Sequence, residues 1–537
     1  MLIAAATRSV RRVLSYGVRD LIWLIYVIGI SSYIHRAAGP FHQLARWRVR
    51  HRRRRDLENR MILLRKRVAN GLWTQRQRGR RVSVAELSPK LEQICRTLRR
   101  PEAETVLASI DQDGFLQPRF AHFWAAPCVD AGSFLPRARF ELLVVDRDGW
   151  IGVRKGFRGN KVAFVNELEA ALDLASVCSH VAEILGIDFE KLSITFAYIP
   201  GQIVREALAE AGAPMRDRDV HRGSVRSART IEQRRRAAGR QLINKVLDPK
   251  TIAGVGEALI SIHRAGYIWG DIKYGNVIIE AVTKTPYFID YERALPLRYF
   301  SRNTATYLRD RDAEKLNEIF GTNLLTAELL RQLSFGHVLY SPFSVGNGLW
   351  WGAIWNPDAG VLRWRRLLSK HLPMPHGGRV LDLGANNGFN ALQMLRSGVG
   401  EVIGIEIDAA TIEEGLFLKR IFEWADNREY RLFYIQGSNA DIVSMNLGRF
   451  DMVTALCTLY YSDDRTMRKI VSDLAQLTDT LVLQCNNDRS IDRSDPSVYE
   501  KASLPFNIAL VRENGFPNVT VIERRGSTQP LVIARTG

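Results

Sequence analysis

The spacing of hydrophobic and polar positions changes along the chain, and each change marks a different kind of predicted structure. Residues 21–30 are a continuous apolar run that extends to Ile34. Residues 139–157 alternate like two strands around an Asp-Gly turn, whereas the apolar residues of 164–175 recur at helical spacing. The elements predicted next are a strand over 193–204, a very basic helix around 234–240 and an apolar helix over 252–265.

Beyond residue 370, short apolar strands alternate with helices. Residues 377–398 predict a strand, a glycine turn and a helix, and residues 402–408 predict a second strand. Strands separated by helices are typical of a parallel, doubly wound sheet. The strands predicted after these lie within 430–442 and 449–464, with a closing antiparallel pair at 519–525 and 530–536.

Together the patterns predict a multidomain protein that combines an α+β part with an α/β part. We expect a basic helical segment over 1–100, a domain of a few strands followed by helices over 101–335, and a doubly wound, Rossmann-like domain over 336–537. A chain of 537 residues is long enough for two or three domains that each bury a core.

The positive charge is concentrated in the first of these parts. Residues 1–100 hold 24 Lys and Arg and 5 Asp and Glu, a net charge of +19, which equals the net charge of the whole chain. The remaining residues are therefore neutral overall. The five cysteines are scattered and show no Cys-x-x-Cys spacing, which disfavours a disulfide framework or a zinc site and fits a reducing compartment.

The basic segment has the features of a peripheral membrane anchor. As a helix, residues 21–34 would rise about 21 Å, short of the ~30 Å hydrocarbon core of a bilayer. Seven arginines and Trp47 follow within residues 45–56. A short apolar helix beside a polybasic stretch predicts that residues 1–56 bind an anionic membrane surface, which places the protein on the cytoplasmic, inner face of the cell membrane.

The segment has three other interpretations. A cleaved signal peptide lacks a good small-residue cleavage site here. Nucleic-acid binding is not favoured, because no stacking platform or recognition motif accompanies the arginines. An amphipathic helix packed on the first domain is the structural alternative to the membrane.

Residues of the central domain have the chemistry of phosphoryl transfer. Asp271, in the loop Gly-Asp-Ile-Lys-Tyr-Gly-Asn, is placed to orient an attacking hydroxyl, and Lys273 is the second catalytic candidate. Asn276 and Asp290 supply the hard oxygen ligands that Mg²⁺ prefers.

Phosphoryl transfer also needs a lysine that holds the phosphates of ATP and a helix glutamate that fixes this lysine. Lys155 and Glu167 suit these roles best, and Lys161 and Glu169 remain alternatives.

The sequence HRAGYIWGDIKYGNVII (263–279), with YFIDYE after it, resembles the protein-kinase-like superfamily, within it the lipopolysaccharide-kinase and aminoglycoside-phosphotransferase-like branch. The resemblance implies a bilobal fold that binds ATP and Mg²⁺, with the adenine meeting backbone groups near Tyr198 and Ile199.

The central domain departs from protein kinases in two respects. No Gly-x-Gly-x-x-Gly loop precedes Lys155, and neither Ala-Pro-Glu nor a long activation segment follows Asp290. These departures favour a small molecule or a glycan over a protein as the acceptor. Because Asp271, Asn276 and Asp290 are all present, an active kinase is favoured over a pseudokinase that only docks a substrate.

The C-terminal domain carries a second set of cofactor residues. Gly384 and Gly388 allow the backbone to approach a cofactor, and Asp382 and Asn386 belong to the same turn. Glu406 ends the next strand, where it can accept hydrogen bonds from ribose hydroxyls.

The sequences LDLGANNG and FDMVTALCTLYY resemble the motifs of class I S-adenosylmethionine-dependent methyltransferases. The resemblance implies S-adenosylmethionine as the cofactor, with Asn439 and Asp441 at its adenine edge. An NAD-binding Rossmann domain is the structural rival, but its Gly-x-Gly-x-x-Gly pattern differs from Leu-Asp-Leu-Gly-x-x-x-Gly.

The sequence places no catalytic base for methyl transfer, which needs alignment and desolvation more than acid–base help. The pocket candidates are Tyr460, Tyr461, Asp463 and Asn486.

The combined prediction is a bifunctional kinase–methyltransferase that modifies a lipid-linked glycan or lipopolysaccharide-type substrate. It is similar in content to the bacterial O-antigen chain-terminating kinase–methyltransferases, although in those the methyltransferase precedes the kinase. The alternatives are a methyltransferase with a pseudokinase docking domain, or an enzyme that modifies a soluble small molecule or RNA. The acceptor, the position of the methyl group and the oligomeric state are left open.

Overall fold

The computed structural model describes residues 39–69, 126–127, 139–144, 151–197, 199, 201–213, 225–334, 343–346, 349–351, 363–486, 496–523 and 528–537. They belong to two compact units, which we call the N-terminal unit (Ala37–Thr326) and the C-terminal unit (Ala327–Gly537). The boundaries expected after residues 100 and 335 stay predictions. The apolar run 21–34 lies outside the described residues.

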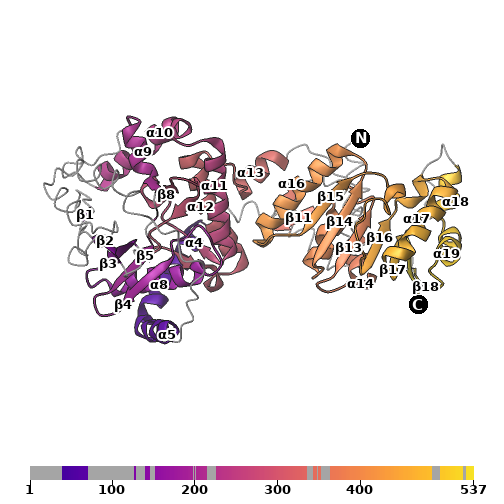
Figure 1. The fold of residues 1–537 in the computed structure, drawn as a ribbon, viewed down its shortest axis with the longest axis horizontal. Helices are drawn as coiled ribbons and strands as arrows, with labels where there is room; N and C mark the ends of the chain where they lie inside the picture. The colour runs from indigo at the N-terminus through magenta and orange to yellow at the C-terminus, as the bar shows by residue number, and fades with distance from the viewer. Residues whose placement is uncertain are drawn as a thin grey trace, which may run out of the picture. The chain divides into compact units, whose positions relative to one another are not determined.

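The N-terminal unit combines a five-stranded antiparallel sheet, in the order β1-β2-β3-β5-β4, with a largely helical part (Figure 1). There are also two smaller sheets, β6-β8-β9 and β10-β7. Their strands lie between helices of this unit in the sequence. The strands are β1 (Ala126–Pro127), β2 (Arg139–Val144), β3 (Ile151–Gly156), β4 (Ile184–Asp188), β5 (Ser193–Ala197), β6 (Gly201–Ile203), β7 (Tyr267–Ile268), β8 (Val277–Glu280), β9 (Pro286–Phe288) and β10 (Leu295–Pro296).

The helices of this unit begin where the sequence supplies caps. Asn160 accepts a hydrogen bond from the Ala163 N–H at the start of α8, and Asp248 caps α11, which has Pro249 in its first turn. The helices are α4 (Gly39–Arg55), α5 (Leu57–Ala69), α8 (Lys161–Ala175), α9 (Val204–Glu210), α10 (Val225–Val246), α11 (Pro249–Arg264) and α12 (Arg302–Phe320), with short 3₁₀ turns η4 (Tyr274–Asn276) and η5 (Leu297–Tyr299).

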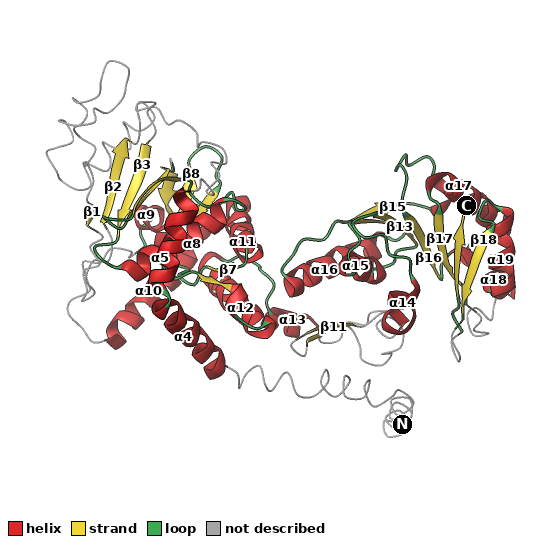
Figure 2. Ribbon diagram, turned by 90° about the horizontal axis from the view of Figure 1, so that it is seen from below, coloured by secondary structure: helices red, strands yellow, loops and turns green. Residues whose placement is uncertain are grey.

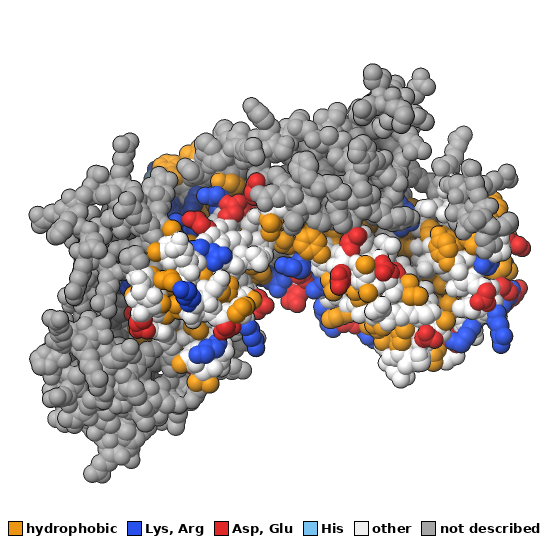
Figure 3. Space-filling view, turned by 90° about the horizontal axis from the view of Figure 1, so that it is seen from above, with side chains coloured by type: hydrophobic (Ala, Val, Ile, Leu, Met, Phe, Trp, Pro, Cys, Tyr) orange, Lys and Arg blue, Asp and Glu red, His pale blue; other side chains and the backbone are white. Residues whose placement is uncertain are grey.

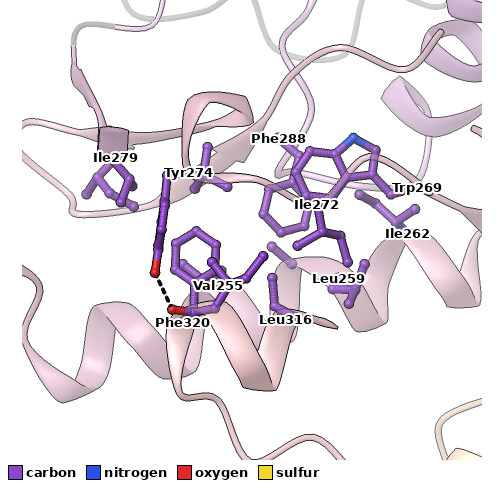
Figure 4. Close-up of a cluster of buried hydrophobic side chains, with 14 of the residues drawn as sticks. Val255, Leu259, Ile262, Trp269, Ile272, Tyr274, Ile279, Phe288, Leu316 and Phe320 are labelled. Atoms are coloured by element: carbon purple, nitrogen blue, oxygen red, sulfur yellow. Dashed lines mark hydrogen bonds between the residues drawn. The ribbon is translucent and has the colours of Figure 1, made fainter. Parts of the chain in front are cut away.

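The core of the helical part surrounds the loop that carries Asp271. Trp269 and Phe288 are fully buried and stack with ring centroids 4.2 Å apart (Figure 4). Tyr274 is also buried, and its hydroxyl donates to the Ile319 carbonyl at 2.8 Å. Hydrophobic side chains therefore anchor the loop on both sides of its polar residues.

Part of the basic N-terminal segment packs on this unit. Helix α5 contributes Met61 and Leu64 to a core formed with α8. Arg53, at the end of α4, is 4 % exposed and donates to Glu169 at 2.8 Å. Arg60 pairs with the same carboxylate. Arg53, which belongs to the stretch expected to lie on a membrane, is thus buried inside the protein.

The C-terminal unit is a doubly wound α/β fold around a seven-stranded sheet, in the order β15-β14-β13-β16-β17-β19-β18. The first five strands of that order are parallel, whereas β19 runs antiparallel to both neighbours. The strands are β13 (Arg379–Leu383), β14 (Glu401–Glu406), β15 (Leu432–Gln436), β16 (Met452–Leu456), β17 (Thr480–Gln484), β18 (Asn518–Ile522) and β19 (Leu531–Arg535), preceded by a hairpin of β11 (Phe343–Gly346) and β12 (Leu349–Trp351).

Helices cover both faces of this sheet (Figure 2). Helices α15 and α16 pack together, and α17 packs with α19 over a core that includes Val453, Leu474 and Leu510. The helices are α13 (Ala327–Ser334), the π-helical turn η7 (Trp364–Leu368), α14 (Ser369–His371), α15 (Phe389–Arg396), α16 (Ala409–Asp426), α17 (Asp464–Leu477), α18 (Pro496–Ala502) and α19 (Leu504–Glu513), with 3₁₀ turns η8 (Asn439–Asp441) and η9 (Leu459–Tyr461). The predicted doubly wound domain is confirmed.

The described surface shows no segregation of charge on the face drawn in Figure 3, where acidic, basic and hydrophobic side chains are interspersed. This agrees with the neutral balance of residues 101–537. Among the described residues, no helix is both long enough and apolar enough to cross a membrane.

The shared carboxylate of Glu169 gives a test of how α4 and α5 are held. We expect Glu169→Gln to lower the free energy of unfolding of the N-terminal unit by about 3–5 kcal/mol, because Arg53 and Arg60 stay buried without a counter-charge. Glu58→Gln is the matched control: its pair with Lys161 is exposed, so its loss costs about 1 kcal/mol or less. Calorimetry resolves both changes, and equal losses would contradict the buried role of Glu169.

Candidate functional sites

In the N-terminal unit, Lys155, Glu167 and Asp290 come together from three elements. Lys155 lies on β3, Glu167 on α8, and Asp290 follows β9. The Lys155 ammonium group donates to Glu167 Oε2 at 2.7 Å and to Asp290 Oδ1 at 2.9 Å. Lys155 and Glu167 are both almost completely buried. The structure thus brings the lysine, the glutamate and one predicted metal ligand into direct contact.

The backbone of Asp290 has an unusual conformation. Its φ of 69° lies in the left-handed region, which non-glycine residues adopt rarely and mainly where the surroundings impose it. The preceding residue, Ile289, is fixed by a hydrogen bond, because its N–H donates to the Asn276 carbonyl at 3.0 Å. This bond joins the segment of Asp290 to the loop of Asp271.

Asp271 is the acceptor at the centre of a second polar group. Lys273 Nζ donates to its carboxylate at 2.8 Å, Asn276 Nδ2 at 3.0 Å and Arg293 Nη1 at 3.1 Å. Lys273 Nζ also lies 3.8 Å from Asp290 Oδ2. The residues predicted for catalysis and for Mg²⁺ therefore form one connected cluster.

Buried hydrogen bonds also hold the backbone of this loop. Asp312, on α12, accepts from the N–H groups of Trp269 and Gly270 at 2.8 and 3.1 Å. Gly270 has a φ of 75°, a conformation that glycine adopts without strain. The hydrogen bonds of Trp269 and Gly270 therefore fix the backbone immediately before Asp271 and determine the direction in which the chain enters this residue.

The charges of the cluster support one another. Burial alone would lower the pKa of Lys155, but attraction by Glu167 and Asp290 outweighs it and raises the pKa. Burial would raise the pKa of Asp290, but attraction by Lys155 and Lys273 outweighs it and lowers the pKa. At neutral pH the cluster therefore presents a charged lysine and a charged carboxylate.

The donor set fits Mg²⁺ and the phosphates of ATP. Because Asn276 uses its amide nitrogen for Asp271, its amide oxygen is left for a cation, as is part of the Asp290 carboxylate. No group of three or more His, Cys, Asp or Glu side chains suited to a metal ion occurs in the part of the chain that the structure describes. A cation at this site would need oxygens from a bound phosphate to complete its shell.

The other predicted residues of this site are placed as follows. Tyr198 lies outside the described residues, and Ile199 lies between β5 and β6 and is half-buried. Lys161 pairs with Glu58 on the surface, and Glu169 pairs with arginines, so neither joins the Lys155 cluster. Arg293, which sequence patterns did not single out, lies three residues after Asp290 and contacts Asp271.

In the C-terminal unit, Asp382 lies near the carboxyl end of the central strand β13. It is 3 % exposed and pairs in register with Thr454, whose hydroxyl donates to Asp382 Oδ1 at 2.7 Å. Ligands of doubly wound sheets bind at this edge. Thr454 was not predicted, although its place on the motif-bearing strand β16 marks it.

The turn after β13 needs both of its glycines. Gly384 and Gly388 have φ values of 60° and 68°. A β-carbon on Gly384 would lie 2.1 Å from the Thr458 hydroxyl, and one on Gly388 would lie 2.0 Å from the Tyr434 hydroxyl. Side chains at these positions would therefore force neighbouring residues apart.

Asn386 and Glu406 join the glycine turn to the adjacent strand. Asn386 has a φ of 52°, and its N–H donates to Glu406 Oε2 at 2.8 Å. The other oxygen, Glu406 Oε1, accepts from the Ile407 N–H at 2.9 Å. A carboxylate has lone pairs for further donors such as ribose hydroxyls.

The remaining predicted residues of this unit lie along the same edge of the sheet. Asn439 and Asp441 form η8 after β15, the strand that pairs with β14. Tyr460 is buried and hydrogen-bonded to Asn486, whereas Tyr461 is exposed. Asp463 caps α17 by accepting from the Thr466 N–H, a structural role.

Two side chains that sequence patterns missed carry polar atoms without partners within the described residues. The Tyr434 hydroxyl is buried beside Gly388 and makes no hydrogen bond. Arg363 Nε is likewise buried and unpaired, and its positive charge counteracts the rise in the pKa of Asp382. Such atoms are costly unless a ligand or water satisfies them, so this edge of the sheet suits a polar, partly anionic ligand.

No family model matches the chain. A tRNA U34 carboxymethyltransferase of Methylococcus capsulatus is 42 % identical over 65 residues, which are 12 % of this chain and 18 % of that enzyme. The chain therefore spans less than a fifth of the length of this curated relative.

Several solved structures are similar to parts of this chain at low sequence identity. The N-terminal domain of EvdMO1 with S-adenosylhomocysteine bound is 18 % identical, with a TM-score of 0.30 over 40 % of this chain and 98 % of that chain. Magnesium protoporphyrin IX methyltransferase of Synechocystis, with S-adenosylmethionine bound, is 17 % identical, with a TM-score of 0.24 over 32 % and 74 %. WbdD, also crystallised with a kinase inhibitor, is 19 % identical, with a TM-score of 0.26 over 34 % and 43 %.

The fold assignment rests on the strand order and not on these alignments. A central first strand, parallel neighbours and one antiparallel strand inserted before the edge define the class I S-adenosylmethionine-dependent methyltransferase fold. The C-terminal unit has this fold, as the sequence predicted.

The buried carboxyl group of Asp382 should make the stability of the C-terminal unit depend on pH. Burial raises its pKa from 3.8 to about 6. Between these values the folded state binds more protons than the unfolded state, so stability falls as pH rises from 4 to 6, by about 3 kcal/mol, and then levels off. We expect Asp382→Asn to remove most of this fall in denaturant titrations, and the exposed Asp479→Asn to retain it. Equal pH profiles for both variants would contradict the assignment.

Proposed function

We propose that the chain is a bifunctional enzyme, an S-adenosylmethionine-dependent methyltransferase in its C-terminal unit and an ATP-dependent kinase in its N-terminal unit. The methyltransferase half rests on the strand order together with the glycine turn that Asn386 and Glu406 tie to β14. The kinase half rests on the contact of Lys155 with both Glu167 and Asp290, beside Asp271.

In the C-terminal unit, each residue has a binding role. Glu406 would accept from the ribose hydroxyls, and Gly384 and Gly388 let the backbone approach the cofactor. Arg363 would face the carboxylate of the methionine part, which its charge near Asp382 supports. S-adenosylmethionine supplies the electrophilic methyl group, and the protein aligns the acceptor and excludes water.

In the N-terminal unit, the roles follow from charge. Lys155 would hold ATP phosphates, oriented by Glu167, while Asn276 and Asp290 would bind Mg²⁺. Asp271 would orient the acceptor hydroxyl and take its proton as the oxygen attacks the terminal phosphoryl group of ATP, whose bond to the bridging oxygen breaks so that ADP leaves. A bilobal, kinase-like arrangement of the unit is part of this proposal.

We further propose a lipid-linked glycan, or a lipopolysaccharide-type molecule, as the substrate, and a peripheral position on the cytoplasmic face of the membrane. The basic segment supports this, because it holds the whole net charge of +19. Sedimentation of the full chain with anionic and with neutral lipid vesicles tests the position; equal recovery with both would contradict it.

A second candidate for the methyl acceptor is RNA. The short match to a tRNA-modifying enzyme is the observation that favours it. Labelled S-adenosylmethionine supplied with total tRNA and with membrane extract separates the two acceptors by the fraction that retains the label.

The carboxylate of Glu406 tests the methyltransferase half. We expect Glu406→Gln to weaken binding of S-adenosylhomocysteine about tenfold or more, because charge-assisted hydrogen bonds to the ribose are lost. Titration calorimetry measures the affinity, and Glu413→Gln, an exposed change on α16, is the control. Unchanged affinity with an intact melting transition would place the ribose elsewhere.

Asp271 tests the kinase half. We expect Asp271→Asn to reduce transfer from γ-labelled ATP about 10²-fold or more, while binding of S-adenosylhomocysteine is unchanged. Glu257→Gln, exposed on α11, should leave transfer intact.

In the decisive experiment, the protein is given labelled ATP and labelled S-adenosylmethionine in the presence of membranes. Both labels on one product support a shared substrate. Methyl incorporation that persists in Asp271→Asn excludes obligatory methylation of the new phosphate. Absence of any transfer by the wild-type chain across candidate glycans would indicate a pseudokinase docking unit and leave the methyltransferase half standing.

A further inference from the structure

Helix α4 places arginine side chains against the loop that carries Asp271. The Nη2 atom of Arg46 lies 2.8 Å from the position that a β-carbon on Gly270 would occupy. Arg293 Nη1 donates to Asp271 Oδ1 at 3.1 Å. A guanidinium group from the N-terminal segment and one from the segment after Asp290 thus meet at the same loop.

The position of α4 is set by packing, not by these charges. Val49 packs on a cluster that includes Ile268 and Leu308, and α4 contacts α12, as Figure 2 shows. Residues three and four apart share one face of a helix, so Arg46, Val49 and Arg50 point to the same side. The hydrophobic contact therefore brings Arg46 to the loop, with Arg50 one turn further along the same side of the helix.

Arg50 is held close to other positive charges. Partial burial, then repulsion from Arg46, Arg293 and Arg54, lowers its pKa to about 10. Neither Arg46 nor Arg50 forms an ion pair with a described residue, and Arg46 Nε is buried without a hydrogen-bond partner. Asp271 offsets part of the charge of Arg293, but the charges of Arg46 and Arg50 stay unfavourable beside it until an anion binds between them.

We propose that Arg46, Arg50 and Arg293 form a binding site for a phosphate or diphosphate group of the acceptor, next to the hydroxyl that Asp271 orients. The inference rests on the proposed kinase half and specifies its substrate as an acidic one. A lipid-linked saccharide, in which a phosphate or diphosphate joins the lipid to the sugar, has the required group.

The arrangement favours a phosphate of the acceptor over a phosphate of the nucleotide. Lys155, with Glu167 and Asp290, is the separate cation available to the nucleotide. Arg50 is accessible to solvent, and its helix belongs to the segment of residues 1–56 that is proposed to meet the membrane. One guanidinium group donates two parallel hydrogen bonds to two phosphate oxygens. A phosphate or diphosphate group has enough oxygens to accept from three arginines.

The test compares two double variants of the full chain that remove the same charge from the same helix. Arg46→Gln with Arg50→Gln removes the proposed site, whereas Arg48→Gln with Arg52→Gln removes two exposed arginines at the same spacing. Binding of inorganic pyrophosphate is measured by calorimetry in the presence of saturating ADP and Mg²⁺.

We expect the first double variant to weaken pyrophosphate binding at least tenfold and the second to weaken it less than twofold. Equal weakening in both would show unspecific attraction and overturn the site. The same measurement with ADP as the ligand separates the two phosphate sources: a comparable loss of ADP affinity in the first variant would assign the arginines to the nucleotide and overturn the acceptor assignment.

The outcome is independent of turnover. If the wild-type chain transfers no phosphoryl group, yet the first double variant alone loses pyrophosphate binding, the kinase proposal fails and the anion site stands. If transfer occurs and the KM for the acidic acceptor is unchanged in the first variant, the kinase proposal stands and the anion site fails.

Discussion

The geometry of the cluster formed by Lys155, Asp271 and Asp290 depends on the stacking of two buried rings, Trp269 and Phe288. Each ring precedes a carboxylate of this cluster by two residues, Asp271 in one segment and Asp290 in the other. Because both rings are fully buried and parallel, neither segment can slide without opening the core. The hydrogen bond between the Ile289 N–H and the Asn276 carbonyl adds a second link. Polar residues from distant parts of the sequence are thus held together by hydrophobic neighbours.

The helix that carries Glu167 is fixed from its other side by the N-terminal segment. Glu169, two residues further on α8, accepts from Arg53 and Arg60, and Arg53 also donates to the Ala294 carbonyl at 3.2 Å. The same arginine therefore contacts α8 and the segment that follows Asp290. Loss of α4 would free both elements that determine the surroundings of the Lys155 ammonium group. Part of the segment predicted to bind an anionic surface is consequently part of the architecture of the unit, as in the structural alternative of a helix packed on the first domain.

The sequence predicted the structure best at residue types that have a single structural role, such as glycine in a tight turn. The glycines of LDLGANNG and the apolar strands beside them predicted the doubly wound sheet, and the structure confirms this fold. The pairing of Lys155 with Glu167 instead of Lys161 with Glu169 required coordinates, because all four residues suit the pattern and only the register of β3 and α8 separates them. Residues such as Tyr434 and Arg363 carry no motif, and only the fold brings them close to Gly388 and Asp382.

The polybasic stretch shows why composition alone does not determine function. Seven arginines between residues 45 and 56 look equivalent in a charge count. The helical period divides them: Arg53 is buried against Glu169, whereas Arg48 and Arg52 are exposed. A charge that is buried and paired has no part in attraction to lipid, so an attraction of this stretch to anionic lipid depends on the exposed positions. The net charge of +19 therefore overstates the charge available to a membrane and understates the part that arginines have in the fold.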